Sequence, residues 1–193
     1  MRLIYPQPPA GIRDLAYRAL NMETLRHPHP EGSNAPANAA GHVPDLHKVF
    51  LLDLAAVGAR KGLRAARHMS WYDVVVLSGI AHGIEIARAG KADGTFVTRG
   101  EDVERQLAIL TSLAARRGSP VEIRILRIPW IANFTLWLHR GKSDRLIPII
   151  TATSRLEAGR EYSPAAFFAA IRDAASHIHQ THGTPKRPIK RKR

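Results

Sequence analysis

The chain has 193 residues, a formal net charge of +13 at pH 7 and 45% hydrophobic residues, which is enough for one globular core. It contains no cysteine, and this excludes disulfides, thiol nucleophiles, iron–sulfur clusters and cysteine-ligated zinc. The sequence has no apolar run of membrane-spanning length, and its N-terminus lacks the apolar stretch of a signal peptide. We therefore expect a cytoplasmic protein without a membrane span.

The N-terminal part of the chain predicts a helix followed by a linker. Residues 1–26 carry isoleucine, leucine and alanine at helical spacing, which predicts an N-terminal helical segment. Residues 27–44 are rich in proline, glycine, asparagine and alanine, and this composition predicts a flexible linker. We expect a single α+β domain over residues 45–183 and a disordered basic tail over residues 184–193.

The first half of the domain predicts one helix among several strands. The apolar run at 49–52 is typical of a buried strand, and "ARKGLRAARH" at 59–68 predicts a helix with Arg60, Arg64 and Arg67 along one side. Further strands are predicted in "WYDVVVLSG" (71–79), "HGIEIARAG" (82–90) and "TFVTR" (95–99).

The second half adds three strands between two helices. Thr98 and Glu101 have the spacing of a capping box, which predicts the start of a helix, and Ser163 followed by Pro164 predicts the start of the last one. Alternating apolar residues predict strands in "VEIRILRIP" (121–129), "NFTLWLH" (133–139) and "RLIPII" (145–150). The short connections favour an α+β fold with a mostly antiparallel sheet and helices packed on one face.

Catalytic signatures are weak. Asp53 and Asp73 interrupt apolar runs, and His82 follows Ser78 by four residues, so an unfamiliar acid/base site would require these side chains to converge. The segment Gly141-Lys142-Ser143 resembles the end of a phosphate-binding loop but lies between two predicted strands, which favours a hairpin turn. We assign no catalytic residue, and an enzyme remains the less favoured alternative.

The histidines do not predict a metal site or a cofactor. At about 100° per residue, His177 and His179 lie about 160° apart around the last helix, so one metal ion cannot bind both them and His182. His27 and His29 could chelate only weakly within the predicted linker. The histidines near the helix end are better explained by the negative end of the helix dipole.

Positive charge is the strongest functional signal. The tail carries six basic residues in its last eight positions, and such a segment can bind phosphates without reading sequence. It holds no aromatic residue, so it offers no base stacking. The predicted polyanion-binding residues are Lys186, Arg187, Lys190, Arg191, Lys192, Arg193, Arg60, Arg64 and Arg67.

Three stretches, "HKVFLLDLA", "RILRIPWIANFTLWL" and "LEAGREYSPAAFFAAIR", occur in this order between about Leu46 and Arg172. Together they resemble a group of uncharacterised bacterial α+β proteins that share an "LRIP…LWL" hairpin pattern. The resemblance implies a shared fold, and no established activity or catalytic residue comes with it.

These observations favour a non-enzymatic binding or assembly module. Its α+β body would dock a protein partner, and its tail would attract nucleic acid or an acidic surface without sequence specificity. The alternatives are an enzyme with an unfamiliar acid/base site and an exported effector addressed by its basic tail.

Overall fold

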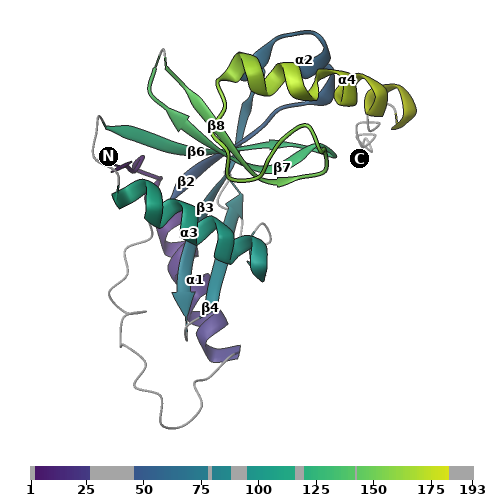
Figure 1. The fold of residues 1–193 in the computed structure, drawn as a ribbon. Coiled ribbons are helices and arrows are strands. Elements are labelled where there is room, and N and C mark those ends of the chain that lie inside the picture. Colours follow the sequence, from purple (N-terminus) through teal and green to yellow (C-terminus); the bar gives the residue numbers. More distant parts are fainter. Residues whose placement is uncertain are drawn as a thin grey trace.

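The computed structural model describes residues 3–26, 46–77, 80–87, 95–115, 120–141 and 143–182 (Figure 1). Its elements, in chain order, are β1 (Leu3–Ile4), α1 (Ala10–Arg26), β2 (His47–Leu51), α2 (Leu54–Gly58), the 3₁₀ helix η2 (Gly62–Ala65), β3 (Arg67–Leu77), β4 (Ile80–Ala87), β5 (Thr95–Arg99), α3 (Glu101–Ala115), β6 (Val121–Ile128), β7 (Ala132–His139), β8 (Arg145–Thr151) and α4 (Pro164–His182). The predicted linker and the predicted basic tail lie outside the described residues. No described helix is both long and apolar enough to cross a membrane.

The strands form one mixed sheet in the order β5-β4-β3-β2-β6-β7-β8, and β1 pairs with the start of β6. Neighbouring strands are antiparallel except for the β1–β6 and β2–β6 pairs, which are parallel. The prediction of an α+β fold with a mostly antiparallel sheet is therefore confirmed.

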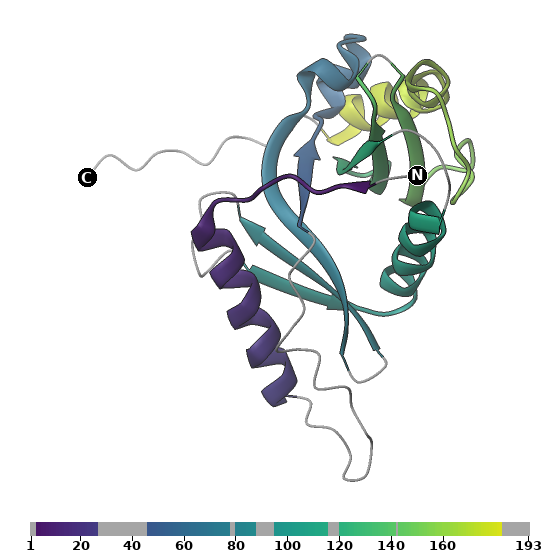
Figure 2. The same cartoon turned by 90° about the vertical axis from the view of Figure 1, so that its left-hand side faces the viewer.

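The helices cover both faces of the sheet, which differs from the predicted one-sided arrangement. Trp71 packs against α1, whereas the hydroxyl of the next residue, Tyr72, donates a hydrogen bond to Gln106 of α3 at 2.5 Å. Successive residues of a strand point to opposite faces, so α1 and α3 lie on opposite sides (Figure 2). Strand pairing places Trp137, which packs beneath α4, on the same face as Trp71. The sheet is apolar on both faces, and α3 covers the face that α1, α2 and α4 leave open.

Strand β6 explains how a pocket can form under α4. Its residues Val121, Ile123 and Ile125 are buried against α3, and Leu126 and Ile128 are buried on the α4 side. The α4 side of the first half of the strand carries charged residues instead of apolar ones. On this side, the hydrophobic core therefore includes only the second half of β6, with Leu126 and Ile128. The first half borders a pocket instead, which Arg124 lines.

The last helix begins as predicted, and the preceding one does not. The Ser163 hydroxyl accepts a hydrogen bond from the Ala166 amide at 3.2 Å, which confirms this serine as the N-cap of α4. Helix α3 begins at Glu101 and its first turn closes on the Gly100 carbonyl, which accepts from the Val103 amide at 2.9 Å. Thr98 belongs to β5, so the predicted capping box is wrong.

The predicted helix over residues 59–68 is also wrong. Helix α2 ends at Gly58, and Arg60 adopts a left-handed conformation with φ of 57°. The Arg60 amide donates to the Val57 carbonyl at 3.1 Å, and the Lys61 amide donates to the Ala56 carbonyl at 3.0 Å. These two bonds form a Schellman motif, which ends the helix. An arginine thus occupies the position that usually holds glycine. Its side chain makes the left-handed conformation less favourable than it would be for glycine.

Candidate anion-binding pocket

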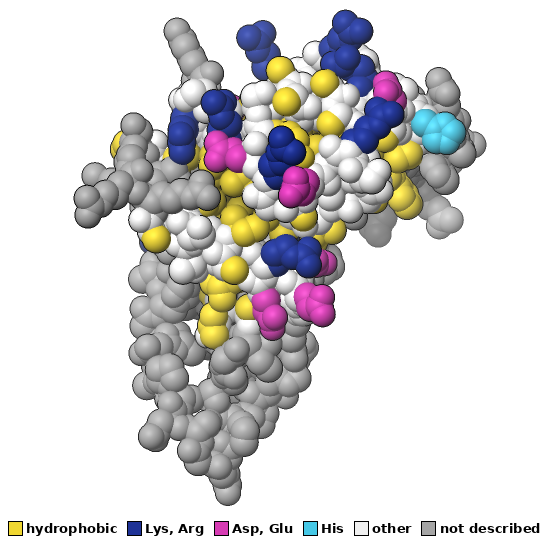
Figure 3. Space-filling model, in the orientation of Figure 1, with side chains coloured by type: hydrophobic (Ala, Val, Ile, Leu, Met, Phe, Trp, Pro, Cys, Tyr) yellow, Lys and Arg dark blue, Asp and Glu magenta, His cyan; other side chains and the backbone are white. Residues whose placement is uncertain are grey.

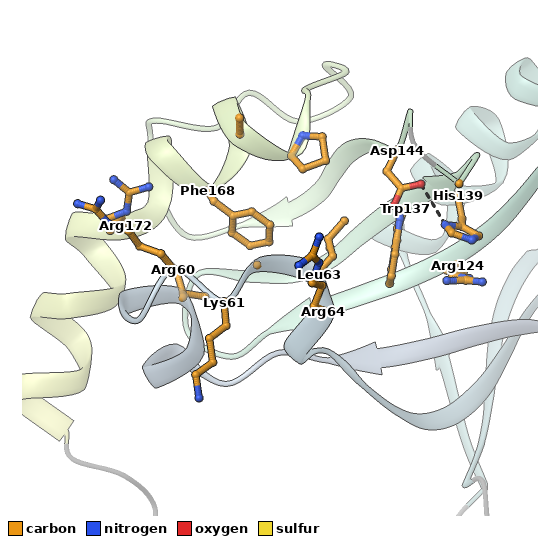
Figure 4. Close-up of a pocket in the computed structure, with 15 residues that line it drawn as sticks. Arg60, Lys61, Leu63, Arg64, Arg124, Trp137, His139, Asp144, Phe168 and Arg172 are labelled. Carbon is orange, nitrogen blue, oxygen red and sulfur yellow. Dashed lines mark hydrogen bonds and ion pairs between the residues drawn. The ribbon is translucent and has the colours of Figure 1, made fainter.

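A pocket of about 690 Å³ lies where α2, η2 and α4 face the β7–β8 hairpin (Figure 4). Its basic lining residues are Arg60, Lys61, Arg64, Arg124 and Arg172. Its large apolar lining residues are Leu63, Trp137 and Phe168. Figure 4 shows Arg60 and Arg172 at one end of the pocket and His139 with Asp144 at the other. Basic side chains also stand along the upper edge of the molecule in Figure 3, where Figure 1 places α2 and α4.

Separate elements bring these cations together. The Schellman motif after α2 places Arg60 and Lys61 at the rim, and Gly62, with φ of 57°, turns the chain into the 3₁₀ helix that carries Arg64. Arg172 comes from the third turn of α4, about one helical turn after Phe168. Residues far apart in the sequence therefore share one basic surface.

Most of this positive charge has no acidic partner. Within the described part of the chain, Arg60, Lys61, Arg64 and Arg172 form no ion pair with a carboxylate. Asp144, the one acidic residue in the lining, lies 3.0 Å from His139 Nδ1 and accepts a hydrogen bond from the Arg140 amide at 3.0 Å. Four cations around one pocket without acidic partners raise the local positive potential and favour an anion.

Arg124 is held differently from the other cations. Its Nε and Nη2 atoms lie 3.0 Å from the two carboxylate oxygens of Glu122, which also lies 3.3 Å from Lys48 Nζ. The guanidinium carbon lies 4.9 Å from the centre of the Trp137 ring, a cation–π distance. This arrangement fixes the orientation of Trp137 and makes Arg124 part of the pocket wall.

Two buried hydrogen-bond donors in the lining lack an acceptor. The indole Nε1 of Trp137, a side chain only 5% exposed, has no hydrogen-bond partner, and neither has the Nε of Arg172. An unsatisfied buried donor costs on the order of 1–3 kcal/mol, and tryptophan can only donate. Both residues line the pocket, and each of these donors can be satisfied only by an oxygen or nitrogen acceptor.

The structure brings two of the predicted polyanion-binding residues to the pocket. Arg60 and Arg64 line it, but they do so from a Schellman motif and a 3₁₀ helix, and not from one side of a helix. Arg67 lies outside the lining: it begins β3, and its Nη2 lies 3.1 Å from Asp53 Oδ2. The six basic residues of the tail lie outside the described residues.

The sequence did not identify the remaining lining residues. Arg124 alternates with apolar residues along β6, and this pattern predicts that its side chain faces solvent. Arg172 follows Phe168 by four residues, a spacing that places both on one helix face and could have linked them. The sequence pattern predicts Trp137 as a core residue, and its side chain is indeed buried. It lines the pocket because it pairs with Arg124, in the half of β6 that borders the pocket.

The three residues of the predicted acid/base alternative do not all converge. Asp73 and His82 are diagonal neighbours on adjacent strands, and they are 3% and 2% exposed. Asp53 pairs with Arg67, which precedes Asp73 by six residues, or about 20 Å along β3. None of the three lines either of the two described pockets, and Ser78 lies outside the described residues.

The predicted hairpin is confirmed by the antiparallel pairing of β7 with β8 and by Gly141, which has φ of 70°, while Lys142 lies outside the described residues. No group of three or more metal-ligating side chains occurs among the described residues. His27 and His29 fall outside them, and the side chains of His179 and His182 are not among those described.

Glu122 predicts a pH-dependent contribution to stability. Burial raises the pKa of its carboxyl, but the hydrogen bond and charge of Arg124, with help from Lys48, outweigh burial and hold the pKa below the ordinary value of 4.5. A lowered folded-state pKa stabilises the protein above the ordinary value, and this stabilisation is lost as the pH falls through the folded-state pKa. The free energy of unfolding of the protein should therefore exceed that of Glu122→Gln at neutral pH, and the gap should shrink below about pH 4.5.

Urea unfolding of both proteins over a pH series measures this difference in free energy, in which any pH dependence common to the two proteins cancels. A gap that stays constant from neutral to acidic pH would show that the ion pair with Arg124 does not stabilise the fold.

Comparisons with known proteins found no match among protein-family models, curated proteins or solved structures. The resemblance to a bacterial group carried by the "LRIP…LWL" pattern stays a prediction.

Proposed function

We propose that this protein is a non-enzymatic binding module for nucleic acid, with the pocket under α4 as its binding site. The observation that carries the proposal is that Arg60, Lys61, Arg64 and Arg172 line one pocket, and none of them has a carboxylate partner among the described residues. Arginine matches phosphate through paired N–H donors, and phosphate contacts supply most of nonspecific nucleic-acid affinity.

The surroundings of the pocket support a long anionic ligand over a single small one. A second pocket of about 500 Å³ shares His139 and Gly141 with the first and adds Arg140 to its lining, together with Glu122, whose carboxylate is paired with Arg124 and Lys48. The chain as a whole carries +13, and six of its last eight residues are basic. A ligand with phosphates spaced along its length could contact the pocket and the tail together, and the tail would add attraction without sequence specificity.

An acidic protein partner is the competing interpretation of the same cations. Carboxylates also pair with arginine, and the predicted docking of a protein partner would use this surface if the partner were acidic. A chain without cysteine folds without disulfides in a cytoplasmic setting, where both kinds of partner occur. The catalytic alternative has less support, because Asp73 and His82 are buried away from both described pockets.

The test is fluorescence anisotropy with a labelled oligothymidylate and with a labelled polyglutamate of equal charge, over a series of salt concentrations. We expect the oligothymidylate to bind more tightly, with log K falling against log salt at about −0.7 per phosphate contact, or about −3 for four pocket cations. Deleting Thr184–Arg193 should make the slope shallower and leave the pocket contribution in place.

Two outcomes would overturn the proposal. Tighter binding of polyglutamate would identify an acidic protein as the partner. Loss of all oligothymidylate binding on tail deletion would show that the pocket cations do not hold the phosphates.

A further inference from the structure

We infer that the pocket receives an unstacked base of a single-stranded nucleic acid, while the basic residues at its rim hold the flanking phosphates. This inference rests on the proposed function and names the class of nucleic acid. It follows from the aromatic walls of the pocket, which a phosphate backbone alone would not use, and from two buried donors in its lining that lack an acceptor.

The walls of the pocket suit an aromatic ring. Phe168 points into the cavity from α4, Trp137 borders it on the β7 side, and Leu63 adds an apolar side chain from η2 (Figure 4). Every nucleic-acid base has a π-face that stacks on such side chains. The volume of about 690 Å³ falls in the range of pockets that enclose small organic groups.

The two unsatisfied donors add polar recognition to this apolar site. The indole N–H of Trp137 and the Nε–H of Arg172 are both buried and lack an acceptor. Bases present carbonyl oxygens and ring nitrogens, and phosphates present oxygens, so a nucleotide can supply an acceptor to each donor. An acidic peptide would offer acceptors to the rim but no ring to the walls.

A duplex cannot use these features. Its bases are stacked inside the helix, and only phosphates and groove edges reach a protein surface. The rim cations Arg60, Arg64 and Arg172 would still attract it through phosphates, but the aromatic walls would stay unfilled. The pocket should therefore favour single strands over duplexes.

The experiment uses the full chain and three labelled probes in fluorescence anisotropy: an oligothymidylate, the same oligomer with abasic residues, and a duplex with an equal number of phosphates. We expect the oligothymidylate to bind at least about fivefold more tightly than the abasic oligomer, since stacking of one base gives this much or more. The duplex should bind like the abasic oligomer or more weakly.

Phe168→Leu removes the stacking ring and keeps most of the packing volume. It should lower the affinity for oligothymidylate toward that of the abasic oligomer and leave the abasic affinity unchanged. The matched control is Phe134→Leu, the same change at a buried site on the opposite face beneath α3, which should keep the preference for bases.

Each outcome separates this inference from the proposed function. Equal affinities for the oligothymidylate and the abasic oligomer, or a base preference that survives in Phe168→Leu, would overturn the inference and leave the proposed function standing. If none of the three probes binds at low salt, the proposed function fails, and the inference fails with it.

Discussion

The triple variant Arg60→Gln/Arg64→Gln/Arg172→Gln should lose most of the nucleic-acid affinity of the pocket at low salt. The three guanidinium groups come from different elements and lie around one cavity without carboxylate partners among the described residues. Each lost phosphate contact should make the slope of log K against log salt shallower by about 0.7, so the triple variant should lose about 2 from that slope. Anisotropy titrations of oligothymidylate over a salt series measure the change.

The chain offers a control with the same loss of charge. Arg67, Arg105 and Arg155 are exposed, lie outside the pocket and each pair with an aspartate. Replacing these three with glutamine should reduce only the general attraction of a positively charged protein and change the salt slope much less. Equal effects of the two triple variants would mean that net charge, and not the pocket, binds the nucleic acid.

A companion variant excludes misfolding as the cause of lost binding. Arg60 occupies a left-handed position with φ of 57°, which glycine adopts without the penalty of a side chain. Arg60→Gly should therefore keep or raise the free energy of unfolding while it weakens oligothymidylate binding. A loss of stability in this variant would indicate that the arginine side chain supports the fold.

Phe167→Ala should lower the free energy of unfolding by about 3–5 kcal/mol, the usual cost of deleting a buried aromatic ring. Phe167 is fully buried, and its ring lies 5.5 Å from that of Phe168 and 6.4 Å from that of Tyr162, measured between ring centres. Removing it would leave a cavity between α4 and the sheet, where the core under the helix is anchored. Urea unfolding followed by tryptophan fluorescence gives the value.

The neighbouring residue provides the control for this prediction. Phe168 is only half-buried and lines an open pocket, so Phe168→Ala removes less buried surface and leaves no closed cavity. Its cost in unfolding free energy should be clearly smaller. If the two alanine variants were equally destabilised, Phe167 would not be the residue that anchors α4.

Much of the local structure could be predicted because the residues that specify it are close in sequence. The alternating apolar residues of β6, β7 and β8 identified these strands, and Ser163 with Pro164 identified the start of α4. The predicted start of α3 at Thr98 is wrong because the T-x-x-E spacing also occurs by chance. Gly100 lies between the end of β5 and the start of α3, and its carbonyl accepts the first hydrogen bond of the helix.

The region from residue 59 to residue 68 shows where local patterns fail. Its spacing of arginine and alanine suits a helix, but the chain forms a Schellman motif, a 3₁₀ turn and the first residues of β3 instead. The pairing of β3 with β2 begins at Arg67, and this long-range contact overrides the helical preference of the segment. Two of the three arginines predicted to lie along one helix side, Arg60 and Arg64, line the pocket, but the sequence did not predict the surface that they form.

Composition and short-range periodicity are enough to predict the sign of the charge, the absence of cysteine chemistry, the α+β class and most of the strands. In contrast, the position of α3 on the opposite face and the placement of Arg60, Arg64 and Arg172 around Trp137 and Phe168 follow from long-range packing. A pocket forms where the packing of helix against sheet ends. Whether the half of β6 that borders the pocket lies under α4 depends on strand order and helix placement, which no short stretch of the sequence encodes.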